Sequence, residues 1–346
     1  MATYGWGYRA DQENPIKAIV YHEYGSPDDV LELQDIDKPV VNDDDVLARV
    51  HAASVNPYDW HWVTGLPHFS RTQFGLRKPK VDGLGADMAG QVEAVGKNVT
   101  RIQPGDDVFG DLSVCGLGAF AEYVCVPEHA VVRKPANLTF EQTAAVPLAA
   151  TTALQGLRDH GRIQSGQKVL INGASEGVGT FAVQIAKSFG AEVTGVCSTR
   201  NMEMVRSIGA DHVIDYTQED FTRSGQRYDL MLDLVGNRSV SECRRVLTPQ
   251  GVYMASFGQP DHRWLGPLAQ VFRTLALSPF VSQKMTMYVM KPNQKDLVVL
   301  QELLESGKVA PVIDRTYPLS RIPEAFRYLE EGHAQGKVVI TVAAAD

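Results

Sequence analysis

The stretch INGASEGVGTFAVQIAKSFGAEV, from Ile171 to Val193, predicts a strand, a glycine-rich bend and a helix in direct succession. β-branched residues lead into the bend, and apolar residues with a period near 3.6 follow it. Glycines let a backbone approach a phosphate closely, and the free N–H groups at the start of the helix face the anion. The stretch therefore predicts a dinucleotide site, although a plain tight turn is the alternative. The residues expected to form the phosphate cradle are Gly173, Ser175, Gly177 and Gly179.

One residue of this bend is unexpected. Glu176 stands where a third glycine is usual, and its negative charge opposes a phosphate. Only some positions of such a bend direct their side chains toward the phosphates. We therefore expect the Glu176 carboxylate to lean toward solvent, or toward Lys187 or Arg200.

Strands and helices alternate along the chain around and after the bend. This alternation predicts right-handed crossovers and a parallel sheet covered on both faces. The crevice at the carboxyl edge of such a sheet is the usual place for a ligand. The expected strands are residues 168–173, 191–197, 211–216, 228–236, 251–258 and 285–290, and the expected helices are residues 178–189, 200–208 and 239–247.

The residues before this region predict a β-rich domain. Segments such as KAIVYHEYG, DVLARVHAASV and GQVEAVGKNVTRIQPGDDVFG have strand lengths and are separated by Gly, Pro and Asn-Asp turns. The chain closes with two helical patterns and the strand pattern GKVVITV. We expect a doubly wound domain at 141–290, inserted into a β-rich domain that comprises 1–140 and is completed by 291–346.

The length and composition are typical of a soluble globular protein. The 346 residues are enough for two domains with full cores. The net charge of -8 argues against nucleic acid or an anionic membrane as a standing partner. The four cysteines are scattered, which favours reduced thiols. No signal-peptide pattern and no long apolar run stands out, so we expect a cytoplasmic protein without a membrane partner.

The end of the second predicted strand indicates which dinucleotide binds. A site for NAD needs a carboxylate there, about twenty residues after the bend, to accept the ribose hydroxyls. The strand instead ends in Cys197, Ser198, Thr199 and Arg200, without an acid. Two hydroxyls and a guanidinium suit the 2′-phosphate of NADP(H). The alternative is that Arg200 simply begins a solvated helix.

The chain resembles the medium-chain dehydrogenase/reductases, and among them the zinc-free quinone oxidoreductase-like branch. The resemblance extends over nearly the whole chain. It is carried by AASVNPYDW (52–60), GQVEAVGKNVTRIQPGDDVFG (90–110), AAVPLAATTAL (144–154), the bend, and GKVV (336–339). The resemblance implies an α/β fold with a GroES-like catalytic domain, a Rossmann-type cofactor domain and hydride transfer from C4 of the nicotinamide.

The resemblance also places cofactor residues on this sequence. It implies Asn56 and Thr152 at the nicotinamide end, and Val178 beside the bend's glycines at the pyrophosphate. Ser198, Arg200 and Tyr216 are expected near the adenosine phosphate, although Tyr216 could equally pack at a strand end. The remaining groove residues that it implies are Leu234, Val235, Gly236, Phe257, Gly336 and Lys337.

A catalytic zinc is not expected. Zinc-dependent relatives take the metal from a cysteine, a His-Glu pair and a second cysteine or acid. The matching places hold Asn56 and the pair Ala86-Asp87, and no cysteine lies near residues 145–150. Tetrahedral zinc needs three or four converging ligands of the thiolate, imidazole or carboxylate kind. We therefore predict no metal.

Without a Lewis acid an alkoxide is poorly stabilised, so an enone or quinone is the easier hydride acceptor. Hydrogen-bond donors then hold the developing oxyanion, and a proton follows. Asn56, Tyr58 and His61 are the candidate catalytic residues; His61 could relay a proton or merely flank Trp60 and Trp62.

These observations predict an NADPH-dependent, metal-independent reductase of a small apolar conjugated carbonyl compound or quinone. A metal-free alcohol or carbonyl oxidoreductase is one alternative. An NADPH-binding sensor or scaffold with little turnover is another, of a different class. Association into a homodimer is left open.

Overall fold

The computed structural model describes residues 15–256 and 282–342, and they divide into two compact units. The first unit contains residues 1–148, 292–305 and 313–346, and the second contains 149–291 and 306–312. The boundary therefore falls eight residues after the one expected, and 306–312 group with the second unit rather than the first. The reason for the second difference is local: the side chain of Gln184 bonds to both the N–H and the carbonyl of Ala310.

The second unit is built on a six-stranded sheet in which every pairing is parallel. Its strand order is β10-β9-β8-β11-β12-β13, so the order reverses between β8 and β11. This is the doubly wound order whose ligand crevice lies at the reversal. The strands are β8 (Lys168–Asn172), β9 (Glu192–Cys197), β10 (His212–Asp215), β11 (Tyr228–Asp233), β12 (Leu247–Ala255) and β13 (Lys284–Met287).

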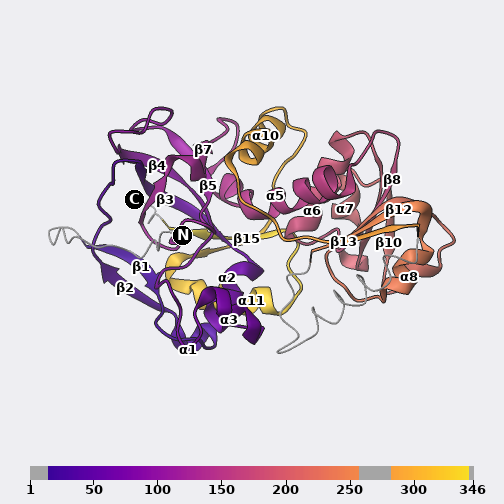
Figure 1. The fold of residues 1–346 in the computed structure, drawn as a ribbon, viewed down its shortest axis with the longest axis horizontal. Helices are drawn as coiled ribbons and strands as arrows, with labels where there is room; N and C mark the ends of the chain where they lie inside the picture. The colour runs from indigo at the N-terminus through magenta and orange to yellow at the C-terminus, as the bar shows by residue number, and fades with distance from the viewer. Residues whose placement is uncertain (1–14, 257–281, 343–346) are drawn as a thin grey trace. The chain divides into compact units, whose positions relative to one another are not determined.

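Helices connect these strands, as the alternation predicts. The helix α6 packs on β8 and β9, α7 on β10, and α8 on β12, and Figure 1 shows these labels grouped around the sheet. The expected helix at 200–208 begins as a 3₁₀ turn at 199–201 before α7. The helices are α5 (Pro147–Gln155), α6 (Gly177–Ser188), α7 (Met202–Ser207) and α8 (Val240–Arg245).

The first unit is β-rich. Its larger sheet has the order β14-β15-β3-β4-β5-β7, with β6 paired to β3, and a two-stranded sheet joins β1 and β2. The strands are β1 (Ile16–Val20), β2 (Glu32–Ile36), β3 (Asp45–Val55), β4 (Asp87–Val95), β5 (Asp107–Asp111), β6 (Tyr123–Pro127), β7 (Val131–Arg133), β14 (Ile313–Pro318) and β15 (Lys337–Thr341).

Chain segments from both ends meet in this unit. The C-terminal strand β15 pairs antiparallel with β3. The C-terminal segment therefore joins the β-rich region, as the sequence analysis expects. Short helices surround the sheet (Figure 1). They are α1 (Pro27–Val30), α2 (Pro57–Thr64), α3 (Arg71–Phe74), α4 (Phe140–Ala144), α10 (Gln294–Glu305) and α11 (Ile322–Glu330).

The α/β fold predicted from the sequence, with a β-rich unit and a doubly wound unit, is confirmed. The segment after Asn56, which the sequence analysis did not assign to a helix, forms α2 because Pro57 and Asn56 favour a helix start and Gly65 ends it in a left-handed conformation. Among the described residues, no helix combines the length and apolar character needed to cross a membrane.

Candidate functional site

The bend after β8 is closely packed. Gly173 has a φ of +90°, a conformation that side chains disfavour. A Cβ on Gly179 would lie only 1.9 Å from the carbonyl oxygen of Gly173, so α6 can approach the bend only because this position is glycine. The first N–H groups of α6 have no preceding turn to bond to. This geometry suits the pyrophosphate of a dinucleotide, with Gly177 and Val178 in the first turn of the helix.

The hydroxyl of Ser175 lies in the bend and is buried. It accepts a hydrogen bond of 2.9 Å from the side-chain amide of Asn201, which follows β9. Accepting this bond leaves the hydroxyl hydrogen available to donate. Ser175 is thus held in place for the phosphate contact predicted for it.

The side chain of Glu176 turns back over the bend. Its carboxyl carbon lies 3.9 Å from the place where a Cβ of Gly173 would stand. It does not lean toward Lys187, whose ammonium pairs with Asp211 at 2.8 Å. Burial, and secondly the charge of Asp233, raise the pKa of Glu176 to about 7. The carboxyl group is therefore divided between its neutral and charged forms at neutral pH.

Asp233 is a residue that the sequence analysis did not single out. It ends β11 at the reversal of the strand order, and it is completely buried. One of its oxygens accepts from Asn172 Nδ2 and from the N–H groups of Val235 and Gly236, and the other accepts from Tyr253 Oη at 2.8 Å. Asp233 thereby fixes the 234–236 loop predicted to line the cofactor groove.

The end of β9 holds the residues predicted for the 2′-phosphate. Ser198 is half-buried, and Thr199 and Arg200 are exposed. The neighbouring strand adds an acid that the sequence analysis missed, because Asp215 is paired with Cys197 in the register of β10 on β9. Its carboxylate accepts from the hydroxyls of Thr199 and Thr217 and from the N–H of Thr217. Three donors already satisfy this acid, and Tyr216 beside it is half-exposed.

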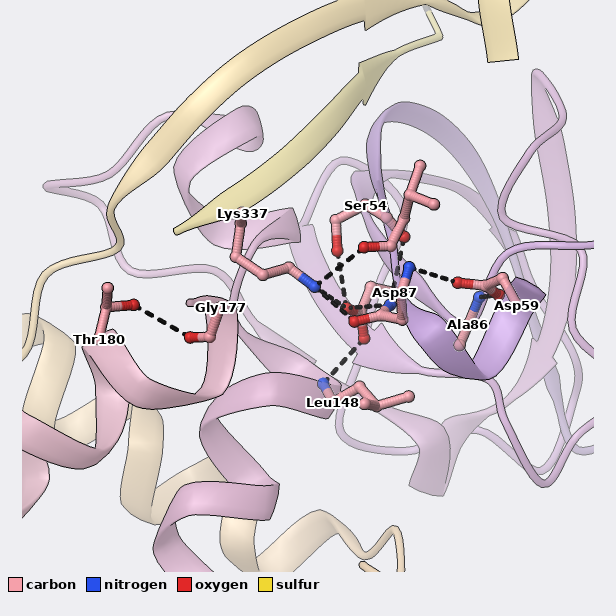
Figure 2. Close-up of polar contacts among 10 residues, drawn as sticks. Ser54, Asp59, Ala86, Asp87, Leu148, Gly177, Thr180 and Lys337 are labelled. Atoms are coloured by element: carbon pink, nitrogen blue, oxygen red, sulfur yellow. Dashed lines mark hydrogen bonds and ion pairs between the residues drawn. The ribbon is translucent and has the colours of Figure 1, made fainter. Parts of the chain in front are cut away.

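A second polar cluster lies in the first unit, and all of its side chains are buried (Figure 2). Its centre is Asp87 at the start of β4. One Asp87 oxygen accepts from Ser54 Oγ at 2.7 Å, from Asn56 Nδ2 at 2.9 Å and from Lys337 Nζ at 3.5 Å. The other accepts from the N–H of Leu148 at 2.8 Å. We call Ser54, Asn56, Asp87 and Lys337 the Asp87 cluster.

The Asn56 amide has a defined orientation in this cluster. Its Nδ2 donates to Asp87 and to the carbonyl of Ser54, which uses both amide hydrogens. Its Oδ1 accepts from the Lys337 ammonium. The Asn56 N–H donates to Asp59, whose other oxygen accepts from the N–H of Ala86. Both amide hydrogens of Asn56 are therefore used inside the cluster, and its side chain has no hydrogen left to donate to a ligand.

Tyr58 and His61 lie on α2, one turn apart. The Tyr58 hydroxyl donates to the carbonyl of Ser113 at 3.1 Å, and burial raises its pKa to about 12. His61 Nδ1 lies 2.6 Å from the carbonyl of Leu66, which can only accept, so Nδ1 carries the hydrogen. Burial lowers the pKa of His61, which favours the neutral ring. A proton relay through His61 would therefore use Nε2, and the catalytic roles stay predictions.

The remaining predicted residues are not brought into one site by the described contacts. Thr152 is buried on α5, and its carbonyl accepts from Tyr288 Oη at 2.9 Å. Gly336 precedes β15 with a φ of +93°, and the Lys337 side chain is taken up by the Asp87 cluster. Phe257 lies outside the described residues.

The residues at the candidate metal positions do not fit a zinc ion. Asn56 and Asp87 are bonded to each other and to an ammonium, and Ala86 has no ligand atom. In the described part of the chain, no three His, Cys, Asp or Glu side chains converge in a way that could hold a metal ion.

In a comparison with known proteins, two family models match the chain. The family described as "Alcohol dehydrogenase GroES-like domain" matches residues 42–136, and the one described as "Zinc-binding dehydrogenase" matches residues 208–340.

The chain is also similar to whole proteins. It is 37% identical to the 2-methylene-furan-3-one reductase of Solanum lycopersicum, over 94% of this chain and 79% of that protein. It is 35% identical to the NADPH-dependent alkenal/one oxidoreductase, chloroplastic, of Arabidopsis thaliana, with the same two coverages. The solved quinone oxidoreductase from Coxiella burnetii superposes with a TM-score of 0.82 at 30% identity, over 95% of this chain and all of that one.

Replacing Glu176 with Gln should remove a pH dependence of NADPH binding. In the wild type the carboxyl is neutral below pH 7 and charged above it, so affinity should fall as the pH rises through about 7. The charge effect near a helix start is about 1 kcal/mol, or roughly fivefold in Kd. Fluorescence titration of both proteins between pH 6 and 8.5 measures it. Because the 2′-phosphate titrates as well, the pH dependence of the Kd is compared between the wild type and Glu176→Gln. If the two Kd curves run parallel over this pH range, the carboxylate lies away from the phosphates.

Proposed function

Since the chain belongs to the medium-chain dehydrogenase/reductase superfamily, in its quinone oxidoreductase-like branch, and is therefore an NAD(P)H oxidoreductase, we propose that it reduces activated double bonds or quinones with NADPH and without a metal ion. The metal-free proposal rests on the Asp87 cluster. In this cluster the ammonium of Lys337 donates to Asn56 Oδ1 and to an oxygen of Asp87. The substrate class is supported by the names of the relatives, two of which act on compounds with a conjugated carbonyl group.

The preference for NADPH rests on the end of β9. NADPH bound there would supply a hydride from C4 of its nicotinamide. Ser198, Thr199 and Arg200 offer two hydroxyls and a positive charge to a 2′-phosphate. Asp215 on the neighbouring strand is engaged by Thr199 and Thr217, which is why we do not assign it the role of the ribose acceptor of an NAD site.

The chain's own groups divide the remaining tasks. The bend and the start of α6 bind the pyrophosphate, and Asp233 holds the loop at 234–236. Asn56 accepts rather than donates, so it orients the nicotinamide end and does not stabilise an oxyanion. A conjugated substrate spreads the developing charge as an enolate or hydroquinone anion. To donate to this anion, the Tyr58 hydroxyl would have to leave the carbonyl of Ser113. His61, whose hydrogen is on Nδ1, would deliver a proton from Nε2 only after taking one up there from solvent. A cytoplasmic location is proposed on the composition alone.

One experiment tests the proposed function. NADPH oxidation by the purified protein is followed with quinones, enones, ketones and aldehydes, before and after dialysis against a chelator. We expect turnover with enones or quinones that the chelator leaves unchanged. Activity confined to ketones and aldehydes would favour a metal-free carbonyl oxidoreductase. NADPH binding without turnover would favour a sensor, and a chelator-sensitive activity with stoichiometric zinc would contradict the metal-free proposal.

Replacing Arg200 with Ala should weaken NADPH and leave NADH almost unchanged. A charge-assisted contact to phosphate contributes about 1.5–3 kcal/mol, which corresponds to roughly tenfold or more in Kd. The wild-type preference for NADPH should also shrink as salt rises, because an exposed ion pair is screened. Arg223→Ala, which removes an equally exposed arginine that pairs with Asp220, is the control. Equal loss of both cofactors would mean that Arg200 only begins α7.

Replacing Tyr58 with Phe and His61 with Ala should lower kcat by about tenfold or more, while the KM for NADPH changes little. Tyr58→Phe removes the hydroxyl but keeps the edge-on ring contacts with Trp62 and Phe74, so it separates chemistry from packing. Steady-state kinetics with NADPH and an enone measure both parameters. A parallel loss of NADPH affinity and turnover would place these residues away from the reacting end.

A further inference from the structure

The ammonium of Lys337 is a buried charge with three oxygen partners. The side chain is 4% exposed, and its Nζ donates to the carbonyl of Val55, to Asn56 Oδ1 and to Asp87 (Figure 2). An ammonium has three hydrogens, and all three find an acceptor. Burying a charge is costly unless it is paired and hydrogen-bonded in this way.

Lys337 is also the only cation among several buried acids. Asp59, Asp87 and Asp111 are each at most 3% exposed, and among the described residues Lys337 is the only lysine or arginine that is buried as a whole residue. Asp111 stands beside Asp87 in the register of β5 on β4, and its Oδ2 has no partner. Without the ammonium, Asp87 would face these two acids with no counter-charge.

The ammonium helps to decide how the Asn56 amide is turned. It has donors only, so the atom facing it must be Oδ1, and the opposite flip would set an NH₂ group against a positive charge. Asp87 and the carbonyl of Ser54 favour the same orientation, because they accept from Nδ2. The orientation of Asn56 consequently depends in part on a residue 281 positions away in the chain.

We propose that Lys337 is a positioning residue of the active site, whose ammonium fills the cation site formed by Val55, Asn56 and Asp87. In this role it holds the Asn56 amide with Oδ1 turned toward the ammonium. It also supplies a counter-charge to Asp87, and Asp87 in turn holds the N–H of Leu148 at the start of α5. The catalytic part of this proposal rests on the proposed function, since it places Asn56 at the nicotinamide.

The pairing of Lys337 with Asp87 is tested by thermal stability, a measurement that does not depend on enzymatic activity. Lys337→Met should lower Tm by about 5–10 °C, because it leaves a buried carboxylate unpaired. The double variant Lys337→Met/Asp87→Asn should recover most of this loss. Lys134→Met is the matched control, because this lysine side chain is 8% exposed but its ammonium donates to the carbonyls of Pro135 and Leu138 outside the cluster. An unrestored Tm in the double variant would overturn the pairing.

The positioning role is tested by the kinetics of the same proteins. Lys337→Met should lower kcat about 100-fold, the order expected for a misplaced group, with the KM for NADPH within about threefold. The stable double variant should remain slow, because no ammonium orients its Asn56. In Lys337→Ala, added n-propylamine replaces the missing atoms and should restore about a tenth of the activity or more, whereas methanol of equal concentration should not.

The outcomes separate the two proposals. A double variant as active as the wild type, or a lost activity that propylamine does not raise, would reduce Lys337 to a structural residue. If the wild type shows no NADPH-dependent turnover, the proposed function fails, and the stability cycle still reports on the buried pair.

Discussion

The first unit depends on the buried carboxylate of Asp87. Both of its oxygens are bound, and the donors come from β3, from β15 and from the start of α5. These segments are as far apart in the chain as residues 54 and 337. A buried carboxylate needs every one of these partners, since an unpaired charge in the interior costs several kcal/mol. The hydrogen bonds that join these segments at Asp87 therefore also hold Asn56, the residue proposed to meet the nicotinamide.

The bend at the start of α6 shows a different way of burying negative charge. Four neutral donors converge on Asp233, one of them from Asn172 at the end of the adjacent strand. Burial, and secondly the charge of Asp233, raises the pKa of Glu176. A second carboxylate at this place is tolerable because it can take up a proton. The Asp87 cluster differs, because the ammonium of Lys337 supplies a buried counter-charge there.

The fold could be predicted from the sequence because its signals are local. The bend, the strand patterns and the turns each occupy about ten neighbouring residues, and their alternation predicted the parallel sheet. In the structural division the boundary falls at 148 and not at 140, since α4 packs on β3 and β4 and the N–H of Leu148 donates to Asp87. The segment 57–64 was not assigned as a helix, because only eight residues separate Asn56 from Gly65.

The site could be predicted only in part, because its most important contacts join distant segments. Asn56 was identified from its own motif, but the pairing of Lys337 with Asp87 depends on strand β15 lying against β3. Asp233 and Asp215 were missed for the same reason: each acts on the end of a neighbouring strand, and sequence order does not reveal which strands are neighbours. A lysine in a glycine-lysine-valine-valine strand has no local reason to be charged and buried. Its role becomes visible only when the carboxylate that requires it has been placed.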